Sequence, residues 1–149
     1  MGNICRSPMA QMVTQQIAAQ AGLGRVIQVE SAGTHASGYG EPPDPRAQKV
    51  LSAKGYSVGK IRSRRVVEND FVDFDLILAM DRSNLENLRR ICPFEQSHKL
   101  RLFLDFSPTM GGTEVPDPYY GSIKGFENVL ALCEIGGKGL IDHFKTATP

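Results

Sequence analysis

Segments with two different hydrophobic periods alternate along this chain, and the alternation constrains its fold more than any other feature. Apolar residues recur at helical spacing after Ser7, in residues 46–54 and from Phe126 to Phe144. Short runs typical of β-strands lie between them, at residues 26–30, 76–80 and 100–104. Strands alternating with helices favour a three-layer α/β fold with a mostly parallel sheet. Since 149 residues suit one domain, we expect a single domain over residues 1–149.

The ends of the expected helices carry recognisable signals, but the sheet is short of strands. Ser7 can cap the first helix and Pro8 fits its first position. Asp81 or Ser83 can cap the helix that follows the apolar strand at 76–80. The chain opens on a loop and a helix, and three strands make a thin sheet for its length. We therefore expect an α/β fold whose first, central strand is missing from the chain.

The composition excludes several classes of function. Lys and Arg number 17 against 16 Asp and Glu, so the net charge of +1 predicts no nucleic-acid partner. No apolar run approaches about 18 residues, which predicts no membrane span. Cys5, Cys92 and Cys133 are widely spaced, which argues against a disulfide framework and favours a reducing, cytoplasmic compartment. The three histidines lack ligand spacing, and we expect neither a metal nor another cofactor.

The first eight residues form the most informative stretch of the sequence. Small and polar residues that lead into a capped helix let several backbone N–H groups converge on one anion, and the helix dipole adds positive potential. At the rim of such a loop, the planar fork of Arg6 could grip a phosphate through two oxygens. The alternative is an N-terminal tail followed by an ordinary capped helix. Loop chemistry alone leaves both interpretations open. The candidate anion-binding residues are Gly2, Asn3, Ile4, Cys5, Arg6 and Ser7.

Residues 2–10, GNICRSPMA, resemble the phosphate-binding loop of the low-molecular-weight protein tyrosine phosphatases. The loop of that family has a nucleophilic Cys, five residues, Arg, and then Ser or Thr. The resemblance continues, in order, through residues 31–34 and 43–47, through 74–81, and through 115–121, VPDPYYG. Four such matches over about 120 residues are specific where each alone would be weak. The resemblance implies the phosphotyrosine phosphatase I type of three-layer fold and phosphotyrosine proteins or aryl phosphates as substrates.

The same comparison places the family's nucleophile outside the sequence. Six positions before Arg6 is one position before Met1, and six positions after Cys5 is Gln11 rather than an Arg. We therefore interpret Met1 as an internal Met of a longer natural protein, and expect the chain as given to be inactive. For Cys5 the favoured interpretation is a small buried thiol.

The resemblance also assigns roles to residues of this chain. Arg6 would neutralise the phosphate oxygens, Ser7 would donate a hydrogen bond to the thiolate, and Asp117 would act as general acid and then general base. Asn3 would brace the loop through Ser31, and Ile61 stands where the family has a His, which removes part of that brace. Arg46 and Asp81 are expected to be structural. The expected substrate cleft contains Ser37, Tyr39, Tyr119 and Tyr120.

Two other functions remain open from the sequence. An arsenate reductase shares the Cys-x5-Arg loop, but it needs a shuttle of further cysteines, and Cys92 stands alone. The second is a non-catalytic domain that binds phosphate, another oxyanion or phosphotyrosine. Such a domain would need only the anion-binding loop and no nucleophilic thiol. The basic run at residues 60–65 is interpreted as a solvated face.

Overall fold

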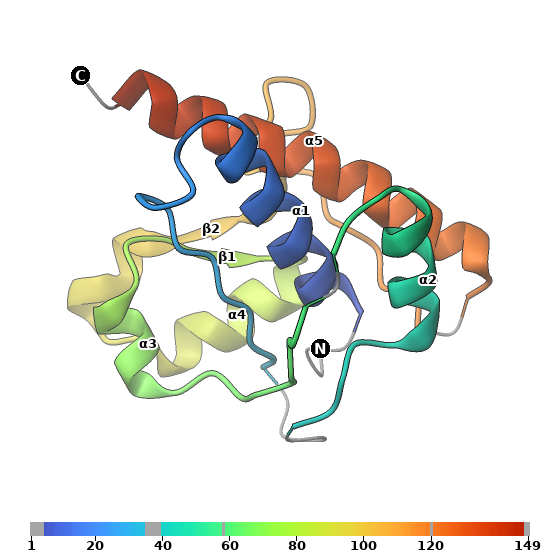
Figure 1. The fold of residues 1–149 in the computed structure, drawn as a ribbon. Coiled ribbons are helices and arrows are strands. Elements are labelled where there is room, and N and C mark those ends of the chain that lie inside the picture. Colours follow the sequence, from blue (N-terminus) through green and yellow to red (C-terminus); the bar gives the residue numbers. More distant parts are fainter. Residues whose placement is uncertain (1–4, 35–39, 58, 120, 148–149) are drawn as a thin grey trace.

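The computed structural model describes residues 5–34, 40–57, 59–119 and 121–147. The helices are α1 (Arg6–Gln20), α2 (Pro45–Ala53), α3 (Glu68–Asp73), α4 (Arg82–Ile91) and α5 (Ile123–Ala147), the 3-10 helices are η1 (Phe94–Lys99) and η2 (Phe103–Phe106), and the strands are β1 (Ile77–Ala79) and β2 (Leu100–Leu102). In Figure 1, α1 and α5 lie on one side of the strands, and α3 and α4 lie on the other. The expected three-layer α/β arrangement is confirmed.

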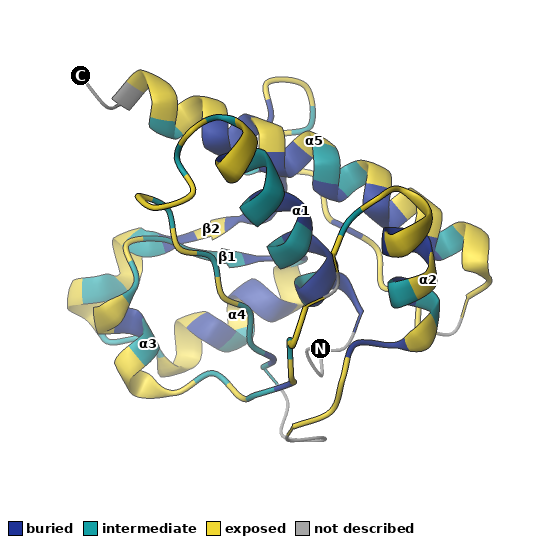
Figure 2. Cartoon of the chain, viewed as in Figure 1, coloured by how far each residue is buried: buried dark blue, intermediate teal, exposed yellow. Residues whose placement is uncertain are grey.

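The two strands run parallel and carry a separate hydrophobic cluster on each face of the sheet. Ile77 pairs with Leu100 and Ala79 with Leu102. The larger cluster joins α1, α2 and α5 around residues such as Met9 and Phe126, and the smaller one packs α3 and α4 against the strands. Figure 2 shows the buried faces of α1 and α5 turned toward each other. Both clusters contain residues of the β1 region, so each cluster packs against the sheet.

The strand expected at residues 26–30 does not form, which corrects the sequence interpretation. Ile27 and Val29 are half-buried between exposed neighbours, as in a strand, but this segment joins no sheet. The backbone of this segment forms hydrogen bonds with the Gln15 side chain instead. Gln15 Nε2 donates to the Ile27 carbonyl at 3.4 Å, and the Val29 N–H donates to Gln15 Oε1 at 3.2 Å. A strand requires a neighbouring backbone, and α1 supplies a side chain here.

The helix ends agree with the sequence in most places and differ at α1. This helix begins at Arg6 with Cys5 as its N-cap, so Ser7 lies inside the helix rather than capping it. Gly22 ends α1 with φ of 77°, a conformation that favours glycine. Asp44 caps α2 and Asp81 caps α4, each through its carboxylate.

Two further features concern the outer surface. The basic run at residues 60–65 is only partly solvated, since half-buried Arg64 donates two hydrogen bonds to the Asp70 carboxylate at 2.9 and 3.1 Å. Within the described ranges, no helix has the length and apolar character needed to cross a membrane.

Candidate active site

The first turn of α1 meets the end of β1 and the segment that leads toward Asp117. Arg6 Nη1 donates to Asp81 Oδ2 at 2.7 Å and to the Val115 carbonyl at 2.7 Å. Asp81 lies two residues after the end of β1, and Val115 N–H donates to the carbonyl of the intervening Met80 at 2.8 Å. These contacts bring three distant segments to the carboxyl end of the strand, the edge at which open α/β sheets bind their ligands.

Arg6 does not lie at a solvent-exposed rim, which corrects the sequence interpretation. Only 3% of its surface is exposed, and Nη2 donates a longer hydrogen bond of 3.4 Å to Asn84 Oδ1. The guanidinium points into the protein because it forms an ion pair with the Asp81 carboxylate. An anion at this site has to exchange with Asp81 for the guanidinium, or be held by the amides of the helix terminus.

Asp81 is ionised in this arrangement. Burial favours its neutral form, but the hydrogen bond from Asn84 N–H, together with the hydrogen bond and charge of Arg6, holds the pKa of the carboxyl below its ordinary value. Asp81 therefore both caps α4 and neutralises Arg6, which confirms the structural role expected for it.

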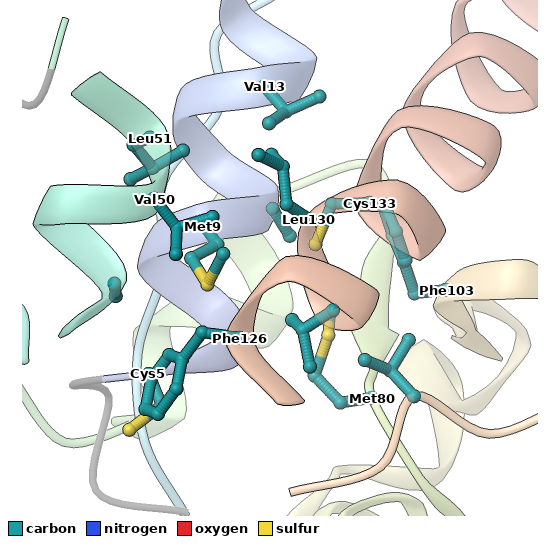
Figure 3. Packing of buried hydrophobic residues seen from close by; sticks show 14 of the residues in the cluster. Cys5, Met9, Val13, Val50, Leu51, Met80, Phe103, Phe126, Leu130 and Cys133 are labelled. Carbon is teal, nitrogen blue, oxygen red and sulfur yellow. The ribbon is translucent and has the colours of Figure 1, made fainter. Parts of the chain in front are cut away.

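Cys5 is a buried thiol, as the sequence interpretation proposed. Its Sγ lies 4.0 Å from Asp44 Oδ2, and 7% of the residue is exposed. Burial, followed by the negative charges of Asp44 and Asp117, raises the pKa of Cys5 to about 12. Figure 3 shows Cys5 within the same hydrophobic cluster as Phe126. A thiol with a pKa this high is mostly protonated near neutral pH, and is therefore a poor nucleophile.

The loop that carries Asp117 is tied to α2 by Arg46. The Arg46 guanidinium donates to the Tyr119 carbonyl at 2.8 Å and to the Gly121 carbonyl at 3.1 Å, while it pairs with the Asp44 carboxylate at 2.9 Å. The same guanidinium lies 4.6 Å from the centre of the Phe126 ring. The side-chain hydrogen bond from Arg46 is the main cause that lowers the pKa of Asp44.

Asp117 itself is exposed, and its Oδ1 accepts a hydrogen bond from Tyr119 N–H at 3.0 Å. The structural role expected for Arg46 is confirmed. Sequence reasoning missed that Arg46 reaches the loop of Asp117, and that Asp44 lies beside the Cys5 thiol. The Asp44–Pro45 helix start was the available signal.

Several expected site residues lie outside the described part of the chain; these are Gly2, Asn3, Ile4, Ser37, Tyr39 and Tyr120. The brace expected between Asn3 and Ser31 also falls there, and Ser31 Oγ donates to Gln11 Oε1 at 2.5 Å. Tyr119 is described, and 42% of it is exposed beside Arg46. Ile61 is half-buried. Among the described side chains, no group of three or more His, Cys, Asp or Glu could hold a metal ion.

Comparison with known proteins identifies the family. The family described as low molecular weight phosphotyrosine protein phosphatase matches residues 1–148. A low molecular weight protein-tyrosine-phosphatase of Streptomyces coelicolor is 41% identical over 94% of this chain and 87% of its own length.

Two solved structures show the same fold. A protein tyrosine phosphatase of Entamoeba histolytica with Hepes in its active site superposes with a TM-score of 0.94, at 39% identity, over 100% of this chain and 95% of its own. Vibrio vulnificus Wzb in complex with benzylphosphonate superposes with a TM-score of 0.84, at 29% identity, over 96% and 93% of the two chains. The chain belongs to the low molecular weight phosphotyrosine protein phosphatase family.

Proposed function

We propose that this protein hydrolyses phosphotyrosine in proteins, or a related aryl phosphate, through a cysteinyl-phosphate intermediate. One observation carries the proposal: the buried contact of Arg6 with Asp81 and Val115 brings the N-terminus of α1 to the segment that continues into Asp117. A helix N-terminus with an arginine suits a phosphate dianion, and an exposed carboxyl group nearby suits the leaving oxygen. Relatives that hold Hepes or benzylphosphonate support an oxyanion ligand.

The reaction follows from these parts. A thiolate attacks phosphorus, so that an S–P bond forms while the P–O bond to the phenol breaks, and the proton of Asp117 passes to the leaving oxygen. The α1 amides and Arg6 stabilise the phosphoryl oxygens as charge shifts. Asp117 then takes a proton from water, whose oxygen attacks phosphorus, and the S–P bond breaks to release phosphate. We propose that the phosphate is cradled by Gly2, Asn3, Ile4, Cys5, Arg6 and Ser7, and that Ser37, Tyr39, Tyr119 and Tyr120 line the cleft.

The attacking thiolate is the part that the printed sequence does not supply. No residue of it stands six positions before Arg6, and Cys5 adjoins Arg6 with its pKa raised to about 12. We therefore propose that the chain, as printed, binds oxyanions without turning over a phosphate ester. We further propose that residues 1–149 act as one domain, because both clusters pack on one sheet, and that the protein works in the cytoplasm, because its cysteines are free thiols.

The test compares the printed chain with a form extended at its N-terminus. The extension is five to eight apolar residues that end in a Cys directly before Met1, and a matched extension ends in Ser. Hydrolysis of phosphotyrosine peptides is measured for all three proteins. We expect turnover from the Cys extension alone, inhibition by vanadate and no effect of chelators.

Each result has one meaning. Turnover from the printed chain that Cys5→Ser abolishes would show that the loop is wrongly aligned. Turnover that depends on a divalent metal would reject the cysteinyl-phosphate route. If the printed chain binds phosphate and no form shows turnover, the protein is a non-catalytic oxyanion-binding domain.

A further inference from the structure

A small pocket lies between α4 and the two segments that contain Thr34 and Arg65. Its volume is about 270 Å³, just below the range of about 300–1,000 Å³ that is common for ligand sites, so it suits a small ligand. The residues that line it are Thr34, Arg65, Val66, Asn87, Arg90 and Ile91. Of the residues that the structure describes, neither Arg6 nor Asp117 lines it, so it is separate from the candidate active site. We call it the Arg65–Arg90 pocket.

Backbone hydrogen bonds hold one wall of the pocket in place. Gly33 N–H donates to the Arg64 carbonyl at 2.8 Å, and Val66 N–H donates to the Gly33 carbonyl at 3.0 Å. Together they form a parallel bridge between Gly33 and Arg65. The bridge fixes the backbone on both sides of this wall, and therefore the positions from which Thr34 and Arg65 reach the pocket.

The opposite wall is one face of the last turns of α4. Asn87, Arg90 and Ile91 are three and four residues apart, so their side chains lie on the same face of the helix. Leu85 and Leu88 of this helix are buried in the smaller hydrophobic cluster, which packs the helix against the sheet. Both walls are therefore parts of the folded core structure.

The pocket carries two guanidinium groups and no opposing acid. Among the described residues, no carboxylate lines the pocket, and none forms an ion pair with Arg65 or Arg90. Their neighbours Arg64 and Arg89, in contrast, each pair with an acidic side chain. The carbonyl end of α4 contributes only about half a negative charge, so two positive charges dominate the local field.

The polar groups of the lining match the oxygens of a phosphate group. A guanidinium can donate two parallel hydrogen bonds to phosphate oxygens. Thr34 Oγ1 accepts a hydrogen bond from Asn84 Nδ2 at 3.4 Å, which leaves the Thr34 O–H able to donate to a ligand. Asn87 Oδ1 accepts from Arg90 Nη1 at 3.4 Å, which leaves the Asn87 amide N–H groups as further donors.

We propose that the Arg65–Arg90 pocket binds a small organic phosphate, with its phosphate group between the two guanidinium groups and its apolar part against Val66 and Ile91. The dianion of a phosphate monoester matches two positive charges, whereas a carboxylate would neutralise only one. Ile91 is 55% exposed, so an apolar ligand group would remove part of its surface from water. This inference does not rest on the proposed function, because it concerns a different site.

The binding test titrates the printed chain with phenylphosphonate, whose P–C bond resists hydrolysis, and follows amide signals by NMR. We expect saturable shifts of the Thr34, Val66 and Asn87 amides. Inorganic phosphate lacks the apolar part and should bind there about threefold or more weakly. Benzyl alcohol lacks the charge and should give no saturable shift. Raising NaCl from about 20 mM to about 300 mM should weaken phenylphosphonate binding, because salt screens exposed charges.

Variants of the chain locate the site independently. Arg65→Gln and Arg90→Gln each remove one guanidinium from the lining and should weaken binding about fivefold. Arg62→Gln and Arg89→Gln remove the same charge from exposed neighbours outside the lining, and should change binding less than about twofold. The four side chains are exposed, so we expect all variants to keep the Tm of the native chain within about 2 °C. If one lining variant does not fold, the other is compared with its neighbour.

Three results would overturn the proposal. Shifts confined to residues 5–7 would show that phenylphosphonate binds only at the N-terminus of α1. Equal losses in the lining variants and their controls would show a general attraction by charge rather than a site. Equal affinity for inorganic phosphate and phenylphosphonate would reject the assigned ligand class.

Discussion

The contact between Arg6 and Asp81 should dominate the stability of the site, and replacing Asp81 tests this directly. The Arg6 side chain is 3% exposed and the Asp81 side chain 22% exposed, with 2.7 Å between Nη1 and Oδ2. Removing one partner of a buried ion pair costs about 3–5 kcal/mol, and partial exposure of Asp81 reduces this to about 2–3 kcal/mol. Asp81→Ala also removes the cap of α4, at about 1 kcal/mol.

We therefore expect Asp81→Ala to lower the free energy of unfolding by about 3–4 kcal/mol. Asp81→Asn keeps a capping oxygen and loses the charge, so we expect about 1–2 kcal/mol. The control is Glu86→Gln, which removes an exposed ion pair with Arg89 at 3.6 Å and should cost less than about 1 kcal/mol. Urea unfolding followed by circular dichroism measures all three.

The pH dependence provides an independent check. The pKa of Asp81 is lowered in the folded state, so its stabilisation is present above the unfolded pKa of about 4 and is lost as pH falls through the folded pKa. The difference in stability between the native chain and Asp81→Asn should therefore shrink between pH 4 and pH 2. A difference that stays constant over this range, or an Asp81→Ala as mild as Glu86→Gln, would refute the reasoning.

Four further outcomes are expected. In the extended form, Asp117→Asn should lower turnover by about 10²–10⁴-fold, and less for acidic leaving groups; equal losses for all substrates would remove Asp117 from the acid role. Cys5 should react with a thiol reagent at pH 8 far more slowly than an unfolded control, because its pKa is raised to about 12. Thr14 Oγ1 is buried without a hydrogen-bond partner, so Thr14→Val should leave urea stability unchanged or raise it by about 1 kcal/mol. Gly139→Ala should lower Tm in a thermal melt, because its Cβ would lie 2.5 Å from the Phe106 carbonyl oxygen.

Part of the site could be predicted from the sequence because its signals are short-range. The Asp81 cap of α4 depends on a contact between residues three positions apart. The order of the family motifs along the chain, from the loop before α1 to Asp117, can likewise be read directly from the sequence. The spacing of Cys5 to Arg6 excluded it as the family's nucleophile, and the usual burial of free cysteines favoured a buried thiol. These interpretations needed no knowledge of how the segments pack.

The rest depended on residues that are distant in the sequence. The apolar alternation at residues 26–30 is real, but strand formation needs a neighbouring backbone, and the Gln15 side chain lies there instead. Arg6 was expected at a rim and is buried because Asp81, 75 residues away, lies beneath it. Arg46 reaches the carbonyls of the Asp117 loop only because α2 packs against α5.

The sequence by itself determined the long helices, most of their ends, the layered α/β class and the family, because periodicity, capping and motif order are read along the chain. Only the tertiary structure decided which charges meet and which thiol is kept protonated. Those properties are set by burial and by pairing between segments brought together in folding, and a pattern within one segment does not contain them.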